Sequence, residues 1–156
     1  MPAVEQRHGA YLISADPARL DVAAIHAYLT RSYWCEGIPL EIVRRSVQNS
    51  LCVGAYLAEG NQQVGLTRFI SDFATFCYVC DVYVHEQHRR HGLAREMLKF
   101  AQRHPRLQGL RRWHLVTRDA HGVYAKYGFK ALGHPDRHME RHDPGIYERR
   151  SAEDNE

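Results

Sequence analysis

A chain of 156 residues is long enough for one domain, since domains cluster at roughly 100–150 residues. It has 44% hydrophobic and 25% charged residues, and no apolar run approaches the ~20 residues that cross a bilayer, so we expect no membrane partner. The net charge of +3 is uneven: residues 85–112 hold eight Lys or Arg against two Asp or Glu, a local charge of +6. This stretch predicts an anionic ligand, either a phosphorylated small molecule or a nucleic acid backbone.

The first third of the chain predicts one strand and two helices. Residues 10–14 are a candidate strand, and Asp16 with Pro17 predicts a helix cap followed by a helix to about Thr30. Pro39 opens a second helix. The segment between the helices, residues 32–38, is irregular.

In the rest of the chain, three predicted strands come first, and helices and strands then alternate. The predicted strands are 51–58, 63–70, 76–84, 110–117 and 129–132, and the predicted helices are 90–104 and 119–127. The order β-α-α-β-β-β-α-β-α-β is that of an α/β (α+β) layer fold. We expect a single domain over residues 1–147 and a disordered tail over 148–156.

The N-terminus indicates where in the cell the protein is found, and the cysteines raise the question of a metal or redox site. The first residues are polar where a signal peptide would be apolar, so we expect a cytoplasmic protein. Cys77 and Cys80 have the spacing of a metal or redox pair, but on a strand residues three apart point to opposite faces. Two buried, unreactive thiols are therefore the better interpretation.

Three histidines spaced four apart would stack on a helix and could bind a metal: His134, His138 and His142. Two prolines, Pro135 and Pro144, oppose a regular helix there. We therefore predict no metal site.

Residues 82–95 run from a predicted strand into a predicted helix. The first N–H groups of a helix have no partners within it and the macrodipole is positive there, so a phosphate fits if side chains leave room. Gly92 and Ala94 leave that room. Donors and positive charge come from Arg89, Arg90 and His91. On these residues alone, a solvated basic helix start is an equally good interpretation.

The same stretch resembles the acetyl-CoA signature of the GCN5-related N-acetyltransferase (GNAT) superfamily. That pattern is Arg or Gln, two residues, Gly, one residue, then Gly or Ala, and Arg89, Gly92 and Ala94 fill it. The resemblance implies that acetyl-CoA is the cosubstrate, that the strand backbone pairs with its pantetheine arm, and that the loop and helix start bind its pyrophosphate. The implied binding residues are Val82, Tyr83, Val84, Arg89, Arg90, His91, Gly92, Leu93 and Ala94.

Residues 117–129 are similar to the late motif of the same family, in which a short helix carries a tyrosine and ends in Gly-Phe. The resemblance implies that Tyr124 protonates the leaving coenzyme A thiolate, which a phenol of pKa ~10 can do for a thiol of ~8.5. Without the resemblance, Tyr124 would be a core residue with a paired hydroxyl. Thr117 stands where the family often has an Asn that bonds pantetheine, and we assign it no role.

The resemblance spans residues 51–132 and implies a small, single-domain, bacterial-type GNAT fold, a mixed, mostly antiparallel sheet flanked by helices. It implies direct transfer of the acetyl group to a primary amine, without a covalent intermediate or a metal. The acceptor stays open, because the fold serves many acceptors. A homodimer through residues 134–147 is also left open.

On the acceptor side, Asp81 is the candidate general base for the attacking amine. The predicted strand places it on one face with Val79 and Tyr83. An aspartate that accepts hydrogen bonds from an adjacent loop is an equally good interpretation. Tyr33 and Trp34 are candidates for the wall of the acceptor pocket, or for simple loop packing.

Two rival functions remain at this stage. One is a basic nucleic-acid-binding module, although the basic stretch has no helix-turn-helix and no aromatic array, and we do not expect a nucleic acid partner. The other is a non-catalytic sensor that binds coenzyme A without turnover.

Overall fold

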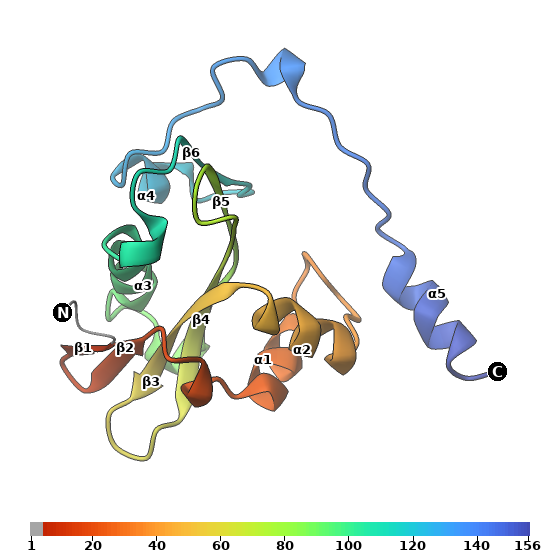
Figure 1. The fold of residues 1–156 in the computed structure, drawn as a ribbon. Helices are drawn as coiled ribbons and strands as arrows, with labels where there is room; N and C mark the ends of the chain where they lie inside the picture. Colours follow the sequence, from red (N-terminus) through yellow and green to blue (C-terminus); the bar gives the residue numbers. More distant parts are fainter. Residues whose placement is uncertain (1–4) are drawn as a thin grey trace.

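The computed structural model describes residues 5–156, and a twisted sheet of six strands runs through its centre (Figure 1). The strands are β1 (Glu5–His8), β2 (Tyr11–Ser14), β3 (Leu51–Leu57), β4 (Gln63–Ser71), β5 (Phe76–Val84) and β6 (Arg112–Leu115). They lie in chain order, and all neighbours are antiparallel except β5 and β6, which are parallel. This mixed, mostly antiparallel sheet confirms the expected fold class.

Helices cover both faces of the sheet (Figure 1). On one face α3 (Leu93–Gln102) buries Met97 and Ala101 against β2 to β5. On the other face α1 (Val22–Leu29) and α2 (Leu40–Gln48) bury a second cluster against Leu66 and Tyr83. Each helix buries one apolar stripe, which is why the sheet has a core on each side. None of the helices within residues 5–156 has the length and apolar character needed to cross a membrane.

The single helix predicted from Asp16 to Thr30 is divided in two. The Asp16 side chain caps a 3-10 turn, Pro17–Arg19, and the backbone then becomes extended at Leu20. The Asp21 side chain accepts a hydrogen bond from the Ala24 N–H and starts α1. Two closely spaced capping residues thus make two helix starts.

The predicted element order is wrong at both ends. A polar strand, β1, was missed because Glu-Gln-Arg-His has no alternating apolar pattern; it pairs with β2 through a turn at Gly9, where φ is +58°. The strand predicted at 129–132 is absent from the described structure, in which Phe129 packs against the core instead. A short α4 (His121–Ala125) precedes it.

The C-terminal segment also differs from its prediction. From about residue 130 the chain runs in an extended path to α5 (Ile146–Glu153), which covers most of the tail expected to be disordered, residues 148–156 (Figure 1). Tyr147 of α5 packs against the core cluster under α1 and α2 and lies next to Gly37. The first turn of α5 therefore contacts the loop between α1 and α2.

The four cysteines are free thiols. Cys77 is buried in the cluster beneath α3, whereas Cys80, three residues further along a regularly paired part of β5, points to the other face of the sheet. Burial raises the pKa of Cys77 and of Cys80 to about 12. The structure therefore confirms that these two thiols diverge.

Candidate active site

A bulge in β5 shapes the site. Asp81 and Val82 of β5 together face the single residue Thr67 of β4, and Asp81 has a left-handed φ of +51°. The extra residue reverses the alternation of the strand: Val79 packs beneath α3, but Tyr83 packs on the opposite face, beneath α1. The expectation that Asp81 shares one face with both was therefore wrong, since it assumed an unbroken strand.

A cavity of about 660 Å³ opens where two strands separate. β5 and β6 pair only as far as Val79 and Leu115, and beyond that point residues 80–84 keep one backbone edge that β6 does not use. The walls come from the α1–α2 loop, from β5, from α3, from the loop after β6 and from α4. A free strand edge beside a cavity can pair with an amide-containing ligand in the manner of an added strand.

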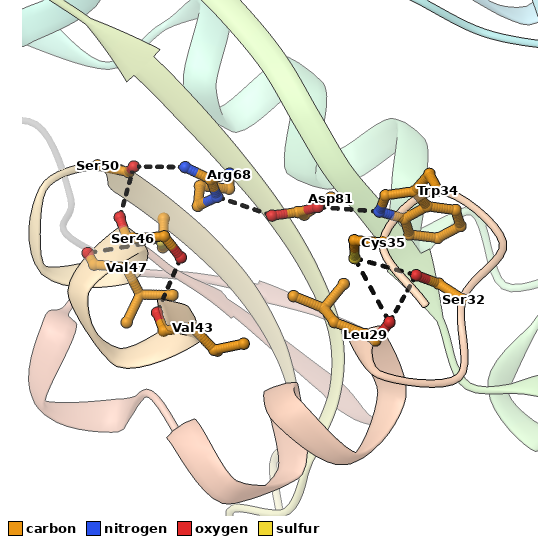
Figure 2. Close-up of polar contacts among 11 residues, drawn as sticks. Leu29, Ser32, Trp34, Cys35, Val43, Ser46, Val47, Ser50, Arg68 and Asp81 are labelled. Carbon is orange, nitrogen blue, oxygen red and sulfur yellow. Dashed lines mark hydrogen bonds and ion pairs between the residues drawn. The ribbon is translucent and has the colours of Figure 1, made fainter. Parts of the chain in front are cut away.

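Asp81 is one of the residues that line this cavity, and its carboxylate is held by two donors (Figure 2). Its Oδ2 accepts a hydrogen bond from Arg68 Nε at 2.7 Å, and its Oδ1 accepts one from Trp34 Nε1 at 2.9 Å. Arg68 also donates to Ser50 Oγ at 3.0 Å. The Arg68 and Asp81 side chains are only 16% and 9% exposed, so this is a largely buried ion pair. Burial is the largest single influence on the Arg68 pKa and lowers it, but the charge and hydrogen bond of Asp81, with smaller contributions from Cys80 and Cys52, together raise that pKa above its ordinary value.

The loop that carries Trp34 is fixed at its base as well (Figure 2). Ser32 Oγ donates to the Leu29 carbonyl at 2.6 Å, and the Cys35 thiol lies 3.1 Å from Ser32 Oγ. Tyr33 packs edge-to-face on Trp34 with ring centroids 5.2 Å apart. Two aromatic rings are thereby held at one end of the cavity.

The predicted phosphate loop forms at the N-terminus of α3. The helix begins at Leu93 rather than at Arg90, because Gly92 is the N-cap and is left-handed, with φ +73°. The first N–H that α3 binds internally is that of Glu96, to the Gly92 carbonyl at 3.0 Å. The N–H groups of residues 93–95 precede it and are available to a phosphate. A Cβ at Gly92 would lie 3.1 Å from the Arg95 guanidinium, so a larger residue would narrow this approach.

Arg89 has a different position from the one its motif suggests. Its Nε donates to the Val84 carbonyl at 3.1 Å and its Nη2 lies 3.5 Å from the Tyr28 hydroxyl, so it ties the loop to the end of β5. The side chains of Arg90 and His91 are exposed at the loop.

The remaining predicted cofactor residues differ in how much of them is accessible. The Tyr83 and Leu93 side chains are buried in the two cores, which leaves only their backbone groups for a ligand. Val82 and Ala94 line the cavity, and Val84 is half-buried at the end of β5.

Tyr124 lies in α4 and lines the same cavity. Burial, with a smaller contribution from Tyr33, raises the Tyr124 pKa, so the phenol is protonated throughout the neutral range. Thr117, at the start of the preceding loop, uses its Oγ1 to accept the Ala120 N–H at 3.1 Å. The threonine hydroxyl thus stabilises the turn that leads into α4.

Two arginines of the site were missed by sequence reasoning. Arg68 is the one charged residue of β4, a strand that is buried along most of its length, and such a residue needs a counter-ion, which was a usable signal. Arg118 lies within the late motif but was given no role; in the structure it lines the cavity beside Tyr33.

Known proteins with similar sequences and folds agree with this geometry. The family described as "Acetyltransferase (GNAT) domain" matches residues 49–131. FG08082 of Gibberella zeae, a protein named "Putative acetyltransferase", is 34% identical in an alignment 139 positions long, and the match covers 76% of this chain and 77% of that protein. A crystal structure from Xanthomonas campestris, described as a GNAT-family acetyltransferase, is 43% identical with a TM-score of 0.84 and covers 88% of this chain and 96% of its own.

These relatives, with the fold and the cavity, define an acetyltransferase. The chain belongs to the GNAT family. An acetyltransferase from Clostridium acetobutylicum, crystallised with acetyl-CoA, shares the fold with a TM-score of 0.58 at 22% identity, over 85% of this chain and 94% of its own. The family assignment is thereby confirmed, whereas acetyl-CoA as the donor of this chain and the roles of single residues stay predictions.

Proposed function

We propose that the chain transfers the acetyl group of acetyl-CoA to a primary amine by direct attack. The observation that carries this proposal is the cavity itself, which places Tyr124 and Asp81 on the walls of one space beside the free edge of β5. Direct attack needs both reactants in one site and a proton donor for the leaving group. The cavity supplies the site and Tyr124 supplies the donor.

The residues at the cofactor end fit acetyl-CoA. The backbone edge of residues 82–84, which β6 leaves unused, suits the amide groups of pantetheine, although the Val84 carbonyl already accepts a hydrogen bond from Arg89 Nε. The unpaired N–H groups at the start of α3 suit the pyrophosphate. Gly92 and Ala94 keep side chains out of the way, and Arg90 and His91 add donors. Arg89 contributes by holding the loop to Val84 and Tyr28.

Tyr124 is the proposed general acid. Its raised pKa means that it is protonated when the amine attacks. Transfer of the proton to a thiolate leaving group of pKa ~8.5 is uphill, because the phenol is the weaker acid, but the two pKa values are close enough for the step to occur within the transfer reaction. In a half-buried position the phenol is shielded from bulk water, which favours transfer to the thiolate.

Asp81 is the proposed first acceptor of the amine proton. A carboxylate has about four lone-pair sites, and Arg68 and Trp34 use one each, so two remain for a substrate or a water molecule. The two fixed donors hold the carboxylate in one orientation on the cavity wall.

A panel of primary amines with acetyl-CoA, followed by release of free thiol, tests the proposed function. We expect turnover with at least one amine and its loss in Tyr124→Phe. Binding of acetyl-CoA without turnover on any amine, unchanged by Tyr124→Phe, would instead support a non-catalytic sensor. A homodimer and a cytoplasmic location stay predictions.

A further inference from the structure

Arg118 lies in the part of the cavity lined by Tyr33, Trp34 and Asp81, which we call the acceptor end. It follows β6 and lines the cavity with Tyr33 and Trp34 of the α1–α2 loop. Its guanidinium carbon lies 4.1 Å from the centroid of the Tyr33 ring, a cation–π contact. This contact joins the β6–α4 loop, which leads to Tyr124, to the α1–α2 loop, which carries Trp34.

The hydrogen-bonding capacity of Arg118 is unused. Stacking on an aromatic ring engages the flat face of a guanidinium and leaves its N–H groups, which point outward in the plane, free to donate. Within residues 5–156 the Arg118 side chain makes no hydrogen bond and no ion pair. Arg68 and Arg89, by contrast, are committed to Asp81 and to the Val84 carbonyl.

The charges around the cavity leave this cation uncompensated by a direct partner. Two carboxylates are among its lining residues, Asp81 and Asp119. Asp81 is neutralised by Arg68, and Asp119 is exposed and forms no ion pair within the described residues. The cationic residues Arg95 and Arg118 line the same cavity, so an anionic group can enter without meeting an excess of negative charge.

We propose that Arg118 binds an anionic group, a carboxylate or a phosphate, on the amine that accepts the acetyl group. The inference rests on the proposed function and narrows its substrate class. Both anions present paired oxygens that match the guanidinium fork. The acceptor would then extend from Arg118 at its anionic end to Asp81 at its amine end, with the rings of Tyr33 and Trp34 beside it.

Matched acceptors test this inference. One pair is an α-amino acid and its α-carboxamide, and the other is an amino alcohol and its phosphate ester. Turnover with acetyl-CoA and binding to the coenzyme A-saturated protein are both measured. We expect the anionic member of at least one pair to have a kcat/KM about 10-fold higher, because a charge-assisted bond is formed only with that member. Which pair shows the preference separates carboxylate from phosphate.

Variants locate the preference. In Arg118→Gln we expect the anionic acceptor to lose its advantage through a higher KM, with kcat little changed, and in Arg118→Lys we expect a partial advantage. Arg45→Gln, at an exposed arginine of α2, is the matched control and should behave as the wild type. The affinity for acetyl-CoA should be the same in all of them.

Three results would overturn the inference. They are equal turnover and binding of both members of each pair, a preference that survives Arg118→Gln, and loss of acetyl-CoA affinity in Arg118→Gln. All three are distinct from failure of the proposed function, in which a protein that binds acetyl-CoA acetylates no amine. In that event the binding measurements still decide whether Arg118 selects anions.

Discussion

The two ends of the cavity are built on different principles. The cofactor end consists of backbone: the open edge of β5 and the unpaired N–H groups before Glu96, exposed by one left-handed glycine, Gly92. The acceptor end consists of side chains brought together from distant parts of the chain, with Trp34, Arg68 and Asp81 in one hydrogen-bonded group (Figure 2). Backbone sites follow from a short local pattern, whereas side-chain sites need the whole fold. Substitutions should therefore affect the two ends separately.

Tyr124 lines the same cavity, and its replacement should have the largest effect. In Tyr124→Phe we expect kcat to fall by about 10²-fold or more, since general acid catalysis contributes that much, with unchanged acetyl-CoA affinity. Thiol release at saturating substrates measures it. Tyr127→Phe is the matched control, because Tyr127 lines the same cavity three residues further on. Equal rates for Tyr124→Phe and the wild type would exclude the proposed acid.

The buried ion pair of Arg68 and Asp81, at the acceptor end, should contribute to the free energy of unfolding. Arg68→Met leaves the Asp81 carboxylate buried without its cation and should lower the free energy of unfolding by about 3 kcal/mol. Urea unfolding measures it. The exposed pair of Arg44 and Glu41 provides the control, since Glu41→Ala should change stability by less than about 1 kcal/mol. Equal losses in the two variants would contradict a structural role for the buried pair.

Trp34→Phe should raise the KM for the acceptor by roughly 10-fold, because it removes the N–H that binds Asp81 and loosens the wall. The affinity for acetyl-CoA should not change, because the substitution affects the acceptor end and leaves the cofactor end intact. Trp113→Phe, in β6 beneath α3 and outside the cavity, is the control. A loss of acetyl-CoA affinity in Trp34→Phe would contradict the separation.

The smallest expected effect concerns the thiol of Cys80, a residue of β5 that lines the cavity. Burial raises the pKa of Cys80 to about 12, so at pH 8 the thiol is protonated, and the thiolate forms only as the pH rises toward that value. We expect iodoacetamide to label Cys80 at pH 8 far more slowly in the native protein than in urea, as followed by mass spectrometry. Rapid native labelling would show that this wall is more open than the structure indicates.

Sequence reasoning succeeded where the pattern is local. Residues 76–84 were predicted as a strand with the bounds of β5, and the glycine pattern located the start of α3 to within three residues. Sequence reasoning failed where contacts between distant parts of the chain determine the structure. The bulge at Asp81 depends on register with β4, and no pattern within β5 indicates it. The partnership of Arg68 with Asp81 and Trp34 joins β4, β5 and the α1–α2 loop, so only the fold could show it.

The central claim is that the free edge of β5 and the start of α3 bind acetyl-CoA. Isothermal titration with acetyl-CoA tests it in the wild type and in Gly92→Glu, which places charge and bulk at the helix start. Gly109→Glu is the matched control, because Gly109 is also left-handed, at φ +71°, and lies outside the cavity. We predict saturable binding to the wild type and to Gly109→Glu, and its loss in Gly92→Glu. Absence of binding to the wild type, or undiminished binding to Gly92→Glu, would contradict the claim.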